Sequence, residues 1–175
     1  MKKVKIPLEA SPWASYEIRC PFSLIDAMFE FAPLEYYKNT LNESVIFMFK
    51  PKIYQEDSPG QLFIFFAVLH SFLRAGYVIN CKSGKYKIKE VPKESKGLYP
   101  GSLTREELQN PFIVFKKAFT YKSLEKMNLA LFEMVNYALN PFSDYPSWDL
   151  ITPYIHITKM LDASWEIYQR RVERI

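Results

Sequence analysis

The chain has 175 residues, of which 49% are hydrophobic, 24% are charged and 17% are aromatic. The ordinary apolar content and the net charge of only +4 exclude a globally disordered chain. This length can bury a sizeable core, so we expect one domain, residues 1–175, that folds without a disulfide or a metal. The longest uncharged stretch, residues 58–73, is shorter than the about 20 apolar residues of a membrane-spanning helix, so we expect no membrane insertion.

Prolines dominate the start of the chain. Pro7 and Pro12 predict an extended or irregular segment over residues 1–22, because proline has no backbone N–H to donate. Together with Glu9, these prolines interrupt the apolar core that a secretory signal requires. We therefore expect a cytoplasmic protein.

Two short helices are predicted next. Ser23 can cap a helix that extends to about residue 31, and Pro33 suits the first position of a second helix over residues 34–41. The apolar run at residues 45–49 is short, and its β-branched start slightly favours a strand.

The clearest helix prediction covers residues 58–76. Ser58 and Gln61 have the spacing of a capping box, and Gly76 is suited to the left-handed position that ends many helices. Residues 62–69 are apolar on every side, which places this helix in the centre of the fold. A buried strand is the alternative interpretation.

A β-hairpin is predicted near residues 77–91. Residues 77–79 have strand-forming side chains, Ser83 and Gly84 form a turn signal, and residues 86–91 alternate in polarity. Residues 92–102 contain two prolines and two glycines and are predicted to be an exposed connector within one domain.

The C-terminal half is predicted to be entirely helical. Thr104 and Glu107 form a second capping box, apolar residues at helical spacing occupy residues 123–139, and Pro153 opens a last helix. The predicted fold class is therefore α+β, predominantly helical, with about six helices and one small antiparallel sheet.

Motifs for catalysis and cofactor binding are missing. The chain has no glycine-rich phosphate loop, no HExxH and no GxSxG. His70 and His156 have no ligand at metal-binding spacing, so we interpret them as helix-surface or core imidazoles. Cys20 and Cys81 are isolated, which favours two reduced, partly buried thiols. We predict no catalytic residue, no metal and no cofactor.

Two pairs of acids lie at a spacing of four residues on presumed helices, Asp26 with Glu30 and Asp162 with Glu166. Such pairs can transfer protons if they are buried, and an enzyme with a site assembled across the fold is one alternative function. The favoured interpretation is a solvated helix surface. Glu166 and Arg170 are likewise expected to form a pair on the solvent side of the last helix.

Residues 82–96 contain six lysines and two glutamates, and therefore account for the whole net charge of the chain. Lys82, Lys85, Lys87 and Lys89 are the candidate contacts to an anion or a nucleic-acid backbone, because strand alternation places three of them on one face. The chain has no arginine here for bidentate contacts, and lysines also protect exposed edge strands from aggregation. The second interpretation is favoured, and a nucleic-acid-associated factor is the runner-up function.

Aromatic residues exceed the number that helical periodicity assigns to a single core. Residues 63–66 and 112–119 are especially rich in rings. Aromatic side chains dominate protein interfaces as well as cores. The sequence therefore favours a non-enzymatic interaction or regulatory domain that binds a protein partner or a second copy of itself.

Overall fold

The computed structural model describes residues 6–54, 58–89, 101–140 and 148–174. Within these ranges the chain forms seven α-helices, one short 3-10 helix and two strands, which confirms the predominantly helical α+β prediction. In chain order the elements are α1 (Pro21–Phe31), α2 (Leu34–Phe47), α3 (Pro59–Lys82), η1 (Ser83–Lys85), β1 (Tyr86–Ile88), α4 (Arg105–Gln109), α5 (Phe112–Tyr121), α6 (Leu124–Leu139), α7 (Ile151–Arg170) and β2 (Val172–Arg174).

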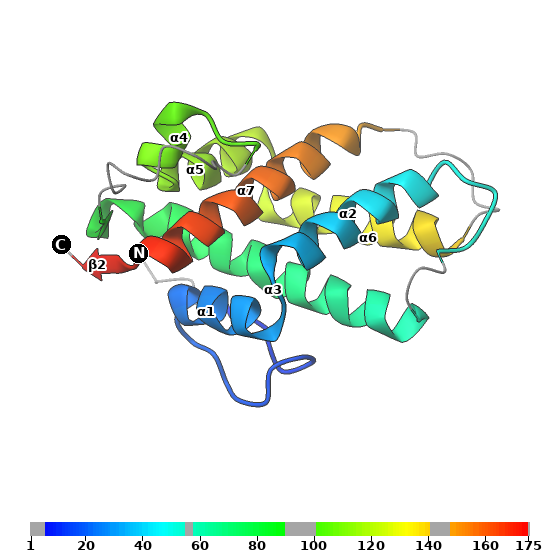
Figure 1. Ribbon diagram of the computed structural model, residues 1–175, viewed down its shortest axis with the longest axis horizontal. Helices are drawn as coiled ribbons and strands as arrows, with labels where there is room; N and C mark the ends of the chain where they lie inside the picture. Colours follow the sequence, from blue (N-terminus) through cyan, green and yellow to red (C-terminus); the bar gives the residue numbers. More distant parts are fainter. Residues whose placement is uncertain (1–5, 55–57, 90–100, 141–147, 175) are drawn as a thin grey trace.

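The longest helix, α3, is the central element of the bundle. It runs along most of the molecule, and α1, α5 and α6 pack against it (Figure 1). The helix α7 packs in turn on α2 and α5. As predicted, the Ser58 side chain accepts a hydrogen bond from the Gln61 backbone N–H at 3.3 Å, which satisfies one of the free donors at the start of α3.

Gly76 does not end α3, which continues for a further six residues to Lys82. A Cβ atom at Gly76 would lie 3.1 Å from Cδ1 of Phe115 on α5. The glycine therefore allows two helices to approach closely and does not supply a left-handed turn, so the predicted helix end was wrong.

The antiparallel sheet exists, but it is not the predicted hairpin. Residues 77–79 belong to α3, where Ile79 is fully buried. The strand β1 pairs with β2 at the C-terminus, with Ile88 opposite Val172. Arg171, whose φ is 62°, separates α7 from β2. A short strand needs only one neighbour, and here that neighbour comes from the far end of the chain.

Helix boundaries differ from the predictions at three other places. The helix α2 extends to Phe47, because Leu41, Ser44 and Val45 are buried at helical spacing, so the strand preference at residues 45–49 was wrong. The helix α1 begins two residues before Ser23, at Pro21. The helix α7 begins at Ile151, two residues before Pro153.

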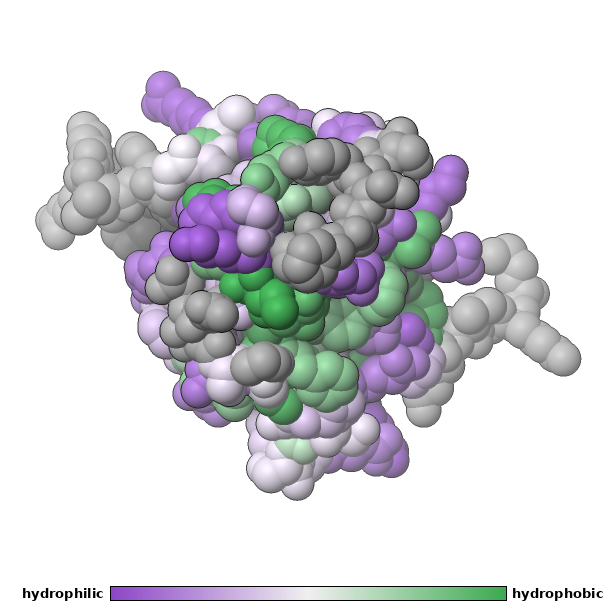
Figure 2. Space-filling model, turned by 90° about the vertical axis from the view of Figure 1, so that its right-hand side faces the viewer, coloured by the Kyte–Doolittle hydropathy of each residue, from purple (hydrophilic) through white to green (hydrophobic). Residues whose placement is uncertain are grey.

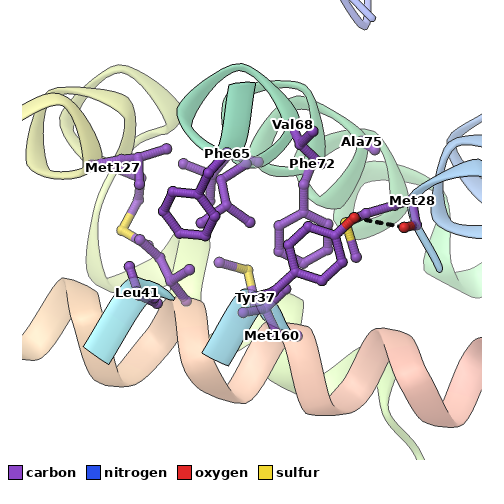
Figure 3. Close-up of a cluster of buried hydrophobic side chains, with 14 of the residues drawn as sticks. Met28, Tyr37, Leu41, Phe65, Val68, Phe72, Ala75, Met127 and Met160 are labelled. Carbon is purple, nitrogen blue, oxygen red and sulfur yellow. Dashed lines mark hydrogen bonds between the residues drawn. The ribbon is translucent and has the colours of Figure 1, made fainter. Parts of the chain in front are cut away.

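Nearly all buried apolar side chains of the described ranges form one continuous core. Figure 3 shows its centre, where side chains from α1, α2, α3, α6 and α7 meet. Tyr37 is fully buried there, and its hydroxyl donates a hydrogen bond of 2.6 Å to the Met28 carbonyl. Burial raises the pKa of the Tyr37 hydroxyl, so it stays protonated and donates to a carbonyl that also accepts a hydrogen bond from the Ala32 backbone N–H.

Candidate interaction surface

Large apolar side chains are exposed where α3 and α6 lie side by side. Phe63 on α3 is 60% exposed, and Leu129 and Phe132 on α6 are 49% and 53% exposed. The half-buried Phe66 connects the two helices, because its ring centroid lies 6.2 Å from that of Phe132 in an edge-to-face arrangement. We call these four side chains the α3/α6 face.

His70 borders this face. Its ring stacks on Phe66 at 6.0 Å, and its Nδ1 atom lies 3.7 Å from Oε2 of Glu9. Burial lowers the pKa of His70, Glu9 raises it and Arg74 lowers it again, with a net decrease. His70 is thus a half-buried imidazole on a helix surface, in agreement with its interpretation from the sequence.

Polar side chains of α6 flank Leu129 and Phe132 along the helix. Glu125 and Lys126 are exposed one turn before Leu129. Glu133 follows Phe132, and among the described residues its Oε2 atom is buried and has no hydrogen-bond partner. A buried carboxylate oxygen without a hydrogen-bond partner is unfavourable, because it has lost its contacts with water.

A second apolar area lies at the end of the bundle where α2 ends and α3 begins. Figure 2 shows apolar (green) surface in the middle of this face, among hydrophilic (purple) side chains. Ile46, Phe49 and Ile53 are exposed at and just beyond the end of α2. Residues 55–57, which follow this area in the chain, are outside the described ranges. All residues of the α3/α6 face are described, so that face is the candidate interaction surface.

The four candidate lysines are all exposed. Lys82 ends α3, Lys85 ends η1, Lys87 lies in β1 and Lys89 directly follows it. The predicted alternation is confirmed, because the side chains between these lysines in β1 are half-buried against the core.

An acid on β2 partly balances this basic strand. Lys87 lies opposite Glu173 in the sheet, and Nζ of Lys89 is 3.7 Å from Oε1 of Glu173. Lys93 and Lys96 lie outside the described residues. Nucleic-acid binding by these lysines stays a prediction, and titration with duplex and single-stranded nucleic acid at two salt concentrations tests it.

The sequence interpretation missed a buried carboxylate on α7. Asp162 is fully buried, its Oδ1 atom lies 2.8 Å from Nζ of Lys38, and the Ser102 hydroxyl donates to its Oδ2 atom. The solvated-surface interpretation was therefore wrong for Asp162. Amphipathic spacing alone did not reveal it, because the residues that cover Asp162 come from distant parts of the chain.

The pair of Glu166 and Arg170 is also not on the solvent side, since the two side chains are only 14% and 7% exposed. Burial raises the pKa of Glu166, Arg170 lowers it and Asp162 raises it again, with a net increase.

The other predicted acid pair, Asp26 with Glu30, does lie at the surface. Glu30 is exposed, and Asp26 is partly exposed with its Oδ1 atom 3.1 Å from Nη1 of Arg171.

Glu107 is a second buried carboxylate, 2% exposed at the start of α4. It accepts hydrogen bonds from Lys159 at 2.7 Å, Lys117 at 2.9 Å and the Thr104 backbone N–H at 3.0 Å. Burial would raise its pKa, but these donors outweigh burial and hold the pKa of Glu107 at about 2. The predicted capping box with Thr104 is confirmed, and the lysines connect α4 to α5 and α7.

The remaining residues of chemical interest lie apart. Cys20 and Cys81 are both unpaired and exposed, whereas partly buried thiols were expected. The His156 ring on α7 stacks on Tyr121 of α5 at 4.9 Å. In the part of the chain that the structure describes, no three His, Cys, Asp or Glu side chains lie close enough together to hold a metal ion.

One described segment, Gly60–Lys85, is long and apolar enough to cross a membrane, but 61% of its apolar window is buried inside the bundle. The central position of α3 accounts for this composition. No protein-family model, curated protein or solved structure matches the chain.

Proposed function

We propose that this protein is an interaction domain that pairs with a second copy of itself through the α3/α6 face. The observation that carries the proposal is the exposure of Phe63, Leu129 and Phe132 on adjacent helices. Exposed apolar surface costs about 25 cal/mol per Å², and large aromatic side chains supply the anchors of most interfaces.

The polar pattern of α6 supports a second copy as the partner. In an antiparallel α6 pair with its two-fold axis between Leu129 and Phe132, each Leu129 meets Phe132 of the second copy. Lys126 then lies beside Glu133 of the second copy, because residues three and four apart share one side of a helix. Such pairing is self-complementary, as a two-fold contact requires, and it places opposite charges next to each other on the half-buried Glu133 and the exposed Lys126.

The α3/α6 face is small, so we expect the dimer to be weak. A stable interface buries about 800 Å² on each partner, which is more than four side chains provide. Glu125, Lys126 and Asn136, which are exposed along α6, would form the polar rim of this contact. We expect the fraction of dimer to rise with protein concentration.

Sedimentation velocity over a range of protein concentrations tests this pairing with two variants. Leu129→Glu and Phe132→Lys each place a charge against an apolar side chain of the second copy, so each variant alone should be monomeric. In a one-to-one mixture, the new glutamate of one variant would meet the new lysine of the other, while the native Leu129–Phe132 contact remains at the second position. The mixture should therefore dimerise, which identifies the antiparallel α6 geometry.

Ile155→Glu is the matched control, since Ile155 is 46% exposed on α7, away from the face. It should sediment as the wild-type protein does, and circular dichroism should show that all variants are folded. A wild-type protein that stays monomeric at every concentration overturns self-pairing. Dimerisation that survives Leu129→Glu overturns the role of this face.

The cytoplasmic location is part of the same proposal. Cys20 and Cys81 are exposed and unpaired. Exposed thiols persist in the reducing cytoplasm, whereas oxidising compartments favour disulfides.

A further inference from the structure

A cavity of about 1100 Å³ lies between residues 6–19 and the C-terminal half of α3. In Figure 1 the N-terminal segment (blue) loops away from α1 before it returns to the start of that helix. Ala14, Tyr77 and Val78 are half-buried and supply apolar walls, with the buried Leu8 and Ile18 behind them. Ligand sites of roughly 300–1,000 Å³ hold drug-sized molecules, so this cavity is large enough for one.

Hydrogen bonds to α3 hold the N-terminal wall in place. Arg74 donates to the Pro7 carbonyl at 2.6 Å and lies 2.9 Å from the Glu9 carboxylate. Trp13 donates to the Ser71 hydroxyl at 3.0 Å, and this hydroxyl donates to the Glu9 carbonyl at 2.8 Å. The cavity therefore has an anchored wall before any ligand is present.

Two acids and two cations line the cavity among the described residues, and Lys82 is the one of them without an ion-pair partner. Glu9 is paired with Arg74, and Glu17 is paired with Arg19 at 2.6 Å. Lys82 also lines the cavity and forms no ion pair with the described residues. The cavity thus combines apolar walls with one lysine that no described acid neutralises.

We infer that this cavity binds a small molecule with an apolar body and an anionic head group, and that Lys82 contacts the head group. A straight-chain carboxylate is the simplest ligand of this class. Its chain would cover Ala14, Tyr77 and Val78, and its carboxylate would accept a hydrogen bond from the Lys82 ammonium. The inference is independent of the proposed dimer, because the cavity lies outside the α3/α6 face.

Cys81 provides a reporter, because its exposed thiol lines the cavity. In a Cys20→Ser variant, the rate at which iodoacetamide alkylates Cys81 can be followed by mass spectrometry. Dodecanoate, below its micelle concentration, should slow this alkylation in a saturable way. Dodecyltrimethylammonium, which has the same chain and a cationic head group, should not slow it at the same concentration.

Lys82→Gln should weaken dodecanoate binding about three- to fivefold, as expected for a partly exposed lysine–carboxylate pair. Lys85→Gln is the matched control, since Lys85 is exposed nearby but does not line the cavity. Alkylation that dodecanoate leaves unchanged overturns the inference. Equal protection by both amphiphiles, or equal binding by the two lysine variants, overturns the role of Lys82 and the anionic head group.

Discussion

Lys38 on α2 and Asp162 on α7 form an ion pair of 2.8 Å although 124 positions separate them in the chain. The Asp162 carboxylate is fully buried, whereas the Lys38 side chain is 30% exposed. Ser102 donates to the second carboxylate oxygen. One buried acid therefore joins α2, α7 and the segment that leads into α4.

Removal of Lys38 should leave the buried carboxylate without its cation. We expect Lys38→Met to lower the free energy of unfolding by about 3 kcal/mol, and the double variant Lys38→Met/Asp162→Leu to recover much of this loss. Urea denaturation measures both changes. Lys116→Met, at an exposed position on α5, should change stability by less than about 0.5 kcal/mol. Equal effects of Lys38→Met and Lys116→Met would contradict a structural role for the pair.

Glu107 should make stability depend on acidic pH. Its pKa is about 2 in the folded protein against an ordinary value of 4.5, so its contribution is fully present above pH 4.5 and is lost as the pH falls through 2. This difference corresponds to about 3 kcal/mol. Urea denaturation at several pH values should show Glu107→Gln less stable than wild type at pH 7, and the two proteins should converge near pH 2.

The exposed Glu30 provides the comparison for this pH effect. Glu30→Gln should follow the wild-type pH profile throughout, because no buried lysine pair is removed. A constant gap between wild type and Glu107→Gln from pH 7 to pH 2 would refute the coupling of Glu107 ionisation to folding.

Gly76→Ala should destabilise the protein although alanine is the better helix former. The added Cβ would lie 3.1 Å and 3.2 Å from two atoms of Phe115, and this ring is fully buried and has little room to move. We expect a net loss of about 1 kcal/mol in urea denaturation. Phe115→Leu in the same chain should remove the clash and make Gly76→Ala less harmful. Gly84→Ala, where the new Cβ meets nothing within 4 Å, is the control.

Arg170 should hold β1 and α4 onto α7. Its guanidinium donates to the carbonyls of Lys89 at 2.7 Å, Leu108 at 2.6 Å and Gln109 at 3.4 Å. Lysine cannot reach several carbonyls with one planar group, so Arg170→Lys should cost about 2–4 kcal/mol. Amide hydrogen exchange should accelerate in β1 and α4. Unchanged protection there would show that other contacts hold these elements.

The starts of α3, α4 and α6 could be predicted because their causes are local. The predicted caps Ser58 and Thr104 each accept a hydrogen bond from a backbone N–H three residues later, and each precedes a helix in the structure. Ser123, at the start of the predicted helix over residues 123–139, does the same. A cap depends on side chains within one turn, so its spacing is visible in the sequence.

Strand pairing could not be predicted in the same way. Residues 77–79 have strand-forming side chains, yet Ile79 is buried as part of α3. The strand β1 formed as expected, but its partner Val172–Arg174 follows the last helix. Both outcomes depend on which distant segments lie next to these residues.

The α3/α6 face, too, was only partly predictable from the sequence. The run at residues 63–66 indicated that aromatic side chains exceed the needs of one core, but it did not distinguish Phe65, which is fully buried, from Phe63, which is 60% exposed. The position of α6 beside α3 makes that distinction. The buried acids Asp162 and Glu107 were likewise indistinguishable from surface acids until their lysine partners were known.

Amino-acid order alone was sufficient for the helical class, the central helix, the caps at Ser58 and Thr104 and the outward-facing lysines in and beside β1, because hydrogen bonds within a turn and side-chain periodicity are local properties. Burial, ion pairing and strand partnership depend on contacts between residues far apart in the chain. The exposed α3/α6 face, the cavity beside Cys81 and the pairing of Lys38 with Asp162 therefore emerged only when the helices were packed together.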